Sequence, residues 1–193
     1  ASRDAVLEHK ADVGLGFDGD GDRCGVVDNT GEEIFADKVG VMLARDMSAV
    51  IKDATFVVDV KSTGLFVTDP VLQAQGAKTT YWKTGHSYMK RRTFETKALA
   101  GFEKSGHFFF NAPVGRGYDD GLVSAAALLA LVDRNPDHPL TGPRRDRTAA
   151  HPPSPVSPHT SALPTSRRDT EHVPDTWPAL SRRRRTLRRN YGT

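Results

Sequence analysis

Cysteine is nearly absent from this chain, since Cys24 is the only one in 193 residues. No internal disulfide can form, which fits a reducing compartment. No apolar run approaches the roughly 20 residues that a membrane-spanning helix needs, and the first residues lack the charged-then-apolar layout of a signal peptide. These absences exclude a disulfide-rich scaffold and favour a cytoplasmic protein without a membrane partner.

Lysine is missing beyond position 138, where nine of the 12 prolines lie. Residues 1–137 carry 16 basic and 20 acidic side chains, a net charge of −4. Residues 138–193 carry 11 arginines and four acids, a net charge of +7. The positive charge of the whole chain therefore comes from its last part and says nothing about the partners of the rest.

We expect residues 137–193 to form a disordered tail, because this composition buries too little apolar area to offset the entropy of ordering. The switch from lysine to arginine also suggests a reading-frame shift in a GC-rich gene, which a single uninterrupted frame in the coding DNA would rule out. Alternatively, the arginines at 182–185, with Arg188 and Arg189, could dock on nucleic acid through phosphate contacts. A basic run without a motif is usually a solvated tail, so nucleic acid is not the favoured partner.

The rest of the chain has the pattern of an α/β domain, in which short runs rich in β-branched and aromatic residues alternate with segments of helical period. We predict a mixed β-sheet flanked by helices, preceded by an N-terminal hairpin. The strands are expected at Val13–Phe17, Cys24–Asp28, Thr55–Val60, Thr79–Trp82, Leu99–Phe102 and His107–Phe110. The three phenylalanines that end the last strand are expected in the core.

Two amphipathic helices are predicted from apolar residues at helical spacing. The first face comprises Val39, Met42, Leu43, Met47 and Val50. The second comprises Leu122, Ala125, Ala126, Leu129 and Val132. Asp119 and Asp120 precede the second helix as a cap and a first-turn acid.

The strongest chemical signal is the loop Asp18-Gly19-Asp20-Gly21-Asp22-Arg23 between the first two strands. Three clustered carboxylates repel one another unless a cation neutralises them, and hard oxygen ligands suit Mg²⁺. The two glycines let the loop curl so that the carboxylates converge. Arg23 could hold a phosphate group beside the metal.

Two other interpretations of this loop are open. A calcium-binding EF-hand loop that starts at Asp18 requires glycine at its sixth position and glutamate at its twelfth, where this chain has Arg23 and Asn29. The other interpretation is a solvated acidic turn, which the strands on both sides make less attractive. Magnesium binding by Asp18, Asp20 and Asp22 is therefore favoured.

Two further polar clusters follow predicted strands, where α/β domains bind ligands. Lys83-Thr84-Gly85-His86-Ser87 offers His86 as an acid, a base or a phosphate contact, with Ser87 near a helix cap, although a lone histidine is more often a surface residue. In the second cluster, Glu103 and Ser105 face the same way on an extended segment and could grip vicinal sugar hydroxyls. His107 could add a proton transfer, and the plain alternative is a polar hairpin edge.

These clusters, in this order, resemble the α-D-phosphohexomutase family over roughly residues 10–135. The family's metal loop is Asp-Gly-Asp-Gly-Asp-Arg, and its sugar loop is Gly-Glu-x-Ser-Gly-His. Here Phe102 stands between Gly101 and Glu103, a departure that bears on the local backbone more than on the role.

The resemblance implies roles for nine residues. Asp18, Asp20 and Asp22 would bind Mg²⁺; Arg23, His86 and His107 would be catalytic; Lys61, Glu103 and Ser105 would bind the phosphosugar. Residues 1–33 would be the end of the family's second domain, and residues 34–136 its third. The implied chemistry is exchange of phosphate between an enzyme phosphoserine and a hexose 1- or 6-phosphate, through a bisphosphorylated sugar.

The resemblance also predicts what this chain alone can do. Nothing in it matches the family's phosphoserine stretch or its C-terminal phosphate-binding domain, so we expect a fragment without turnover. The preferred substrates are mannose or glucose phosphates, with glucosamine phosphate as an alternative. A chain that completes its site with a separate subunit is a further hypothesis, which copurification would test.

Overall fold

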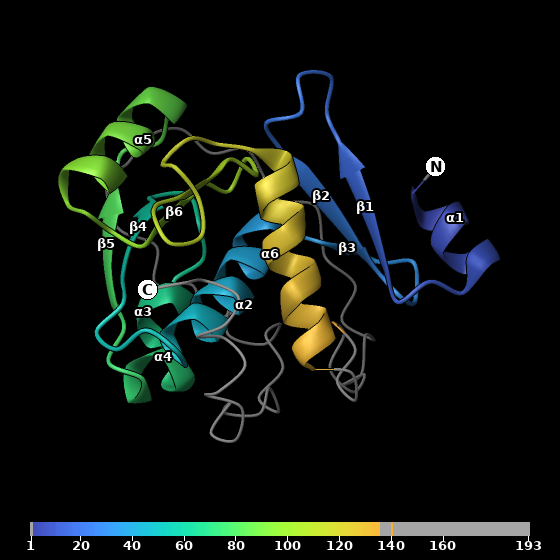
Figure 1. The fold of residues 1–193 in the computed structure, drawn as a ribbon, viewed down its shortest axis with the longest axis horizontal. Coiled ribbons are helices and arrows are strands. Elements are labelled where there is room, and N and C mark those ends of the chain that lie inside the picture. Colours follow the sequence, from blue (N-terminus) through green and yellow to red (C-terminus); the bar gives the residue numbers. More distant parts are fainter. Residues whose placement is uncertain (1, 136–139, 141–193) are drawn as a thin grey trace, which may run out of the picture.

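The structure is a computed structural model that describes residues 2–135 and residue 140. The predicted disordered tail lies outside the described residues, Leu140 excepted. Two β-sheets and six helices make up the described part (Figure 1). None of these helices is both long and apolar enough to cross a bilayer.

The first sheet is antiparallel and is built from the predicted N-terminal hairpin. Its strand order is β1 (Val13–Phe17), β2 (Cys24–Asp28) and β3 (Glu33–Ile34). The helix α1 (Ser2–His9) packs beside β1 through the buried side chain of Val6. Asp28 is fully buried and accepts hydrogen bonds from the backbone N–H groups of Thr30 and Glu32 at 2.8 and 3.0 Å, which stabilises the turn between β2 and β3.

The second sheet is mixed, as predicted. Its strand order is β5 (Lys78–Trp82), β4 (Thr55–Asp59), β6 (Ala100–Phe102) and β7 (Phe108–Phe110). Strands β5, β4 and β6 are parallel, and β7 is antiparallel to β6. The expected strand ends agree with the observed ones to within one residue.

Helices cover both faces of the second sheet, so the predicted α/β class is confirmed. These helices are α2 (Ala36–Ser48), α3 (Leu65–Thr68), α4 (Pro70–Ala74), α5 (His86–Glu95) and α6 (Gly121–Arg134). Phe108 and Phe110 point into the larger core with α2, α3, α4 and α6, whereas Phe109 packs with Met89 of α5 on the other face. The three phenylalanines therefore alternate across β7, as expected of core residues.

The larger core also joins the two sheets. Val26 of β2 is buried in it, and Val13 and Leu15 of β1 pack against it. In Figure 1, α6 lies between the first sheet and the rest of the fold. The hairpin is thus held by the same apolar core as the second sheet, and the division into domains at residues 33 and 34 stays a prediction.

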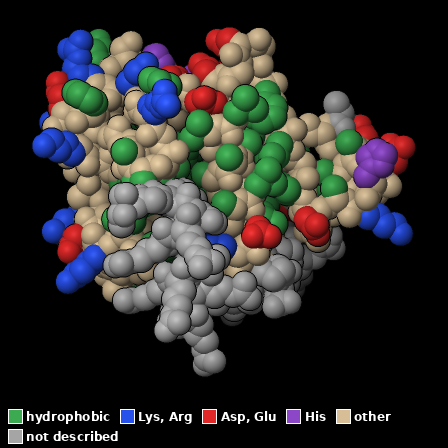
Figure 2. All heavy atoms as spheres, viewed as in Figure 1, with side chains coloured by type: hydrophobic (Ala, Val, Ile, Leu, Met, Phe, Trp, Pro, Cys, Tyr) green, Lys and Arg blue, Asp and Glu red, His purple; other side chains and the backbone are tan. Residues whose placement is uncertain are grey.

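The predicted apolar face of α6 is right at Ala125, which is buried, and at Val132, which packs against the larger core, but it is wrong at both leucines. Leu122 and Leu129 are 68% and 46% exposed, whereas Leu128 and Leu131 are buried. Figure 2 shows apolar side chains over α6 on the surface. Because α6 is apolar nearly all round, its spacing cannot determine which side packs inward.

Other local predictions need correction. Val50 lies beyond the end of α2 and is 39% exposed. Helix α5 begins at His86 with Gly85 as N-cap, at a φ of +132° and without a side-chain cap, so Ser87 does not cap it. Asp120 does cap α6, but Asp119 lies before the helix and faces elsewhere.

Candidate functional site

Two of the predicted polar clusters and Lys61 lie at one edge of the second sheet. Lys61 follows β4, His86 follows β5, and Glu103 follows β6. Because these three strands are parallel, their carboxyl ends meet at the same edge. The parallel pairing of the three strands therefore brings Lys61, His86 and Glu103 to one edge, although they are up to 42 positions apart in sequence.

The sugar loop predicted at residues 103–107 is a tight turn between β6 and β7. The N–H of Glu103 donates to the carbonyl of His107 at 3.1 Å, and the N–H of Gly106, at a φ of +98°, donates to the carbonyl of Glu103 at 3.0 Å. Ser105 Oγ lies 2.8 Å from His107 Nδ1, and Glu103 Oε2 lies 3.4 Å from the same nitrogen. The three side chains thus form one hydrogen-bonded group.

Glu103 is 2% exposed, so it is no solvated residue of a hairpin edge. Its Oε1 accepts a hydrogen bond from the backbone N–H of Gly85 at 2.7 Å. This bond ties the sugar loop to the loop that carries His86. The carboxylate is held from both sides, which fixes its orientation within the site.

The metal loop joins β1 to β2, and its three carboxylates converge. One oxygen each from Asp18, Asp20 and Asp22 lies within 4.8 Å of the others. Arg23 donates to Asp18 through its backbone N–H at 3.2 Å and through Nε at 2.5 Å. The hydrogen bond from Arg23 holds the pKa of Asp18 below its ordinary value, and Asp18 raises the pKa of Arg23 in turn.

The chemistry of this loop fits a divalent cation. Asp22 Oδ1 is buried and accepts no hydrogen bond from any described residue, and Arg23 Nε is 3.7 Å away from it. A buried carboxylate oxygen without a donor is costly unless a cation occupies the space beside it. Three converging carboxylates with one unsatisfied oxygen suit Mg²⁺, which takes a few protein oxygens and completes its octahedron with other ligands.

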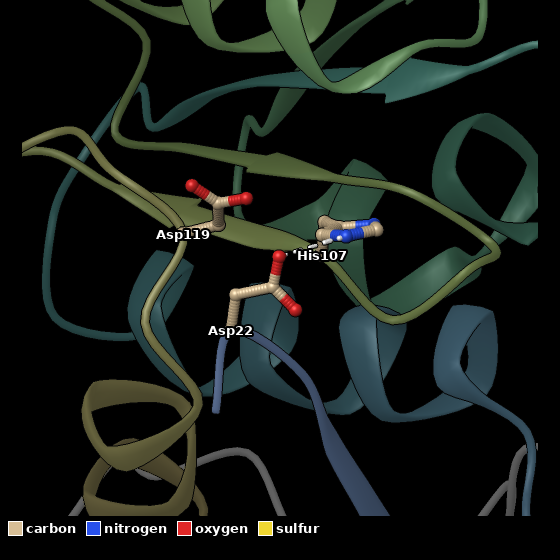
Figure 3. A group of neighbouring side chains, drawn as sticks. All are labelled: Asp22, His107 and Asp119. Carbon is tan, nitrogen blue, oxygen red and sulfur yellow. Dashed lines mark ion pairs between the residues drawn. The ribbon is translucent and has the colours of Figure 1, made fainter. Parts of the chain in front are cut away.

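The metal loop is docked directly on the sugar loop (Figure 3). Arg23 and His107 form an isolated antiparallel bridge through their backbones, and Asp22 Oδ2 lies 3.3 Å from His107 Nε2. From the other side, the N–H of Gly121, the first residue of α6, donates to the carbonyl of Gly21 at 2.9 Å. The loop therefore sits between β7 and the N-terminus of α6.

A residue that sequence reasoning missed completes the arrangement. Asp119 Oδ2 lies 2.7 Å from His86 Nε2, and the Asp119 side chain is only 7% exposed. Asp119 also comes within 4.8 Å of the ligand atoms of Asp22 and His107 (Figure 3). Two aspartates precede α6 and only Asp120 is needed as the cap. The second aspartate, Asp119, is therefore the sequence feature that indicates another role.

The structure brings together eight of the nine predicted residues. Asp18, Asp20, Asp22 and Arg23 form the metal loop, Glu103, Ser105 and His107 form the sugar loop, and His86 packs its ring 5.8 Å from that of His107. Lys61 is exposed at the same sheet edge. Within residues 2–135, no hydrogen bond or ion pair joins Lys61 to the other eight.

Known proteins resemble this chain in sequence and in fold. Residues 35–145 match the family described as phosphoglucomutase/phosphomannomutase, alpha/beta/alpha domain III. A phosphomannomutase/phosphoglucomutase of Pseudomonas aeruginosa is 42% identical over 130 residues, which are 67% of this chain and 27% of that protein. The chain thus spans about a quarter of the length of this relative.

Solved structures resemble the fold. A phosphoglucomutase/phosphomannomutase family protein from Burkholderia thailandensis has a TM-score of 0.63 and 36% identity, over 68% of this chain and 28% of that one. An N-acetylphosphoglucosamine mutase from Aspergillus fumigatus, solved with GlcNAc-6P and magnesium, has a TM-score of 0.50 and 13% identity, over 68% and 36% of the two chains. The second likeness concerns the fold alone.

Proposed function

This chain belongs to the phosphoglucomutase/phosphomannomutase family, and we propose that it supplies the metal-binding and sugar-binding part of a hexose phosphate mutase. The observation that carries the proposal is the docking of the metal loop on the sugar loop, where Asp22 Oδ2 lies 3.3 Å from His107 Nε2. A phosphoryl group held between these loops would contact both a cation and the sugar hydroxyl that gives or receives it.

Asp18, Asp20 and Asp22 would hold Mg²⁺, because their carboxylate oxygens converge and hard oxygen ligands suit that ion. When bound, the ion would offset negative charge on the phosphoryl group. The side chain of Arg23 is 46% exposed, so its guanidinium can reach a phosphate while Nε keeps Asp18 in place. Its fork geometry suits two phosphate oxygens at once.

The sugar loop would bind the hexose and handle a proton. Ser105 and Glu103 offer a hydroxyl and a carboxylate to vicinal sugar hydroxyls. His107 is 18% exposed, with Nδ1 beside Ser105 and Nε2 beside Asp22. The contact with Asp22 at Nε2 would hold the ring in one orientation, so that Nδ1, in place of its contact with Ser105, would take or return a hydroxyl proton. His86 and Lys61 would contact phosphate from the neighbouring loops.

The proposed substrates are mannose or glucose phosphates, with glucosamine phosphate as the alternative, because Glu103 and Ser105 would contact hydroxyls that these sugars share. We expect no turnover from this chain, since its sequence has no match to the family's phosphoserine stretch. Binding, rather than activity, is therefore the property to measure.

The test is a titration of α-D-glucose 1-phosphate into the ¹⁵N-labelled chain with Mg²⁺ present, followed by amide NMR shifts. We expect shifts centred on residues 103–107. Ser105→Ala should weaken binding about fivefold, the value of one hydrogen bond. The matched control is Ser48→Ala, since Ser48 Oγ makes no hydrogen bond in the described part of the chain.

Equal affinity in the wild type, Ser105→Ala and Ser48→Ala would contradict the assignment of the sugar loop. No shifts with glucose, mannose or glucosamine phosphates at millimolar concentration would contradict the proposed binding function. Parallel titrations with the three sugars would rank the substrate alternatives.

A further inference from the structure

Asp59 is the last residue of β4 and is completely buried. Its carboxylate accepts hydrogen bonds from three different loops. Ser62 Oγ and the backbone N–H of Lys104 donate to Oδ1, the latter at 3.1 Å, and Thr84 Oγ1 donates to Oδ2 at 2.9 Å. None of the functional roles above involves Asp59.

These three loops carry the side chains that are proposed to bind the sugar phosphate. Ser62 follows Lys61, Thr84 lies two residues before His86, and Lys104 lies between Glu103 and Ser105. A single carboxylate therefore joins three loops, the last of which lies 45 positions after Asp59 in sequence. The hydrogen bond from Gly85 to Glu103 is a second link between two of the loops, but it does not include the loop of Lys61.

The energetics of this group favour a role in positioning over one in stability. Among the described residues, no lysine, arginine or histidine forms an ion pair with Asp59, so its charge is offset only by hydrogen-bond donors. A buried charge costs free energy that an apolar residue would avoid. The carboxylate instead fixes the direction from which each hydrogen-bond donor approaches, and so orients the loop to which that donor belongs.

We propose that Asp59 is a positioning residue that holds the three ligand loops of the sugar-phosphate site in one mutual arrangement. It does not touch the ligand and acts through Ser62, Thr84 and the backbone of Lys104. The expected effect of Asp59 on sugar-phosphate affinity rests on the proposed function. Its expected effect on the mutual arrangement of the three loops does not.

The test removes donors rather than Asp59 itself, so that folding is retained. Thr84→Val and Ser62→Ala each remove one hydroxyl, and the double variant removes both. Thr79→Val is the matched control, because Thr79 Oγ1 donates to the carbonyl of Phe66 at 3.1 Å and has no part in the Asp59 group. All variants are made in the full chain and labelled with ¹⁵N.

The first measurement is hydrogen exchange at the amide of Lys104, which neither substitution alters directly. We expect exchange about tenfold faster in the double variant, since a hydrogen bond to a charged group is lost when the carboxylate turns or shifts. We expect no change at Lys104 in Thr79→Val. Urea unfolding of each variant separates this local effect from loss of global stability.

The second measurement is the affinity of the same samples for α-D-glucose 1-phosphate. A loss of several-fold in Thr84→Val and the double variant, with wild-type affinity in Thr79→Val, supports the proposal. Unchanged exchange at Lys104, or changes that only follow global stability and appear equally in Thr79→Val, would overturn it. A third outcome is faster exchange at Lys104 in the double variant together with no sugar-phosphate binding by the wild type. In that case Asp59 would still join the three loops, and the proposed function would be refuted instead.

Discussion

The contact between α6 and the metal loop makes Gly121 a sensitive position. A Cβ atom added there would lie 2.7 Å from the carbonyl oxygen of Gly21 and 2.8 Å from that of Arg23. Both neighbours are backbone atoms of the metal loop. Gly121→Ala must therefore displace the loop by several tenths of an ångström and strain the hydrogen bond between the Gly121 N–H and Gly21.

The magnitude follows from two opposing terms. Overpacking of this kind costs about 1–3 kcal/mol, and replacing glycine by alanine in a helix returns up to about 1 kcal/mol. The free energy of unfolding should therefore fall by between about 0 and 3 kcal/mol. Metal affinity should fall by at least about tenfold, because the displaced loop carries all three carboxylates. A loss of about 1.4 kcal/mol in the free energy of Mg²⁺ binding corresponds to a factor of ten in affinity.

Two glycines of the loop provide the comparison. Gly19 has open space around its Cβ position, so Gly19→Ala should bind Mg²⁺ with an affinity close to that of the wild type. Gly21 also has open space, but its φ is +75°, where alanine costs about 1–2 kcal/mol. Gly21→Ala should therefore lie between the other two variants.

The assay is isothermal titration of Mg²⁺ into each glycine variant, with urea unfolding to measure stability. Wild-type affinity in Gly121→Ala would refute the argument that α6 supports the metal loop. An equal loss in Gly19→Ala would also refute it, since added bulk anywhere in the loop would then suffice.

Two other predictions concern stability and reactivity. Asp69 and Asp120 each cap a helix through two backbone N–H groups, but only Asp69 also pairs with the buried guanidinium of Arg45. Urea unfolding should show a loss of about 1 kcal/mol for Asp120→Ala and about 3–5 kcal/mol for Asp69→Asn, which leaves a buried charge without this partner; equal losses would contradict the ion-pair argument. Burial raises the pKa of the Cys24 thiol to about 11, so iodoacetamide should modify the native chain slowly at pH 8. Because the folded pKa lies above the unfolded value of about 8.5, the free energy of unfolding should fall as pH rises from there towards 11, and Cys24→Ser should remove that part of the slope.

Much of the fold could be predicted because its signals are local. The strands are bounded by turn residues and are rich in β-branched and aromatic side chains, which fit a half-buried or fully buried sheet. The metal loop could be predicted for the same reason, since its three carboxylates lie at alternate positions in sequence. Its flanking strands, Val13–Phe17 and Cys24–Asp28, pair in the register that places the three aspartates at the turn.

The parts that escaped prediction depend on contacts between distant segments. The roles of Asp59 and Asp119 follow from which loops come together at the sheet edge, and nothing near either residue in sequence indicates its partners. The exposed face of α6 escaped prediction because an all-round apolar helix has no polar side to mark the surface. The contact between Gly121 and Gly21 depends on docking of the hairpin against α6, which no periodicity reports.

We propose that the loop between β1 and β2 forms a metal site. Isothermal titration of Mg²⁺ into the wild type, Asp20→Asn and Asp12→Asn tests this site. Asp12 is an exposed aspartate just before β1 and outside the cluster, so it controls for the loss of one negative charge. We expect Mg²⁺ binding that is retained in Asp12→Asn and weakened at least about tenfold in Asp20→Asn. Equal affinities in all three proteins, or no binding to the wild type, would contradict it.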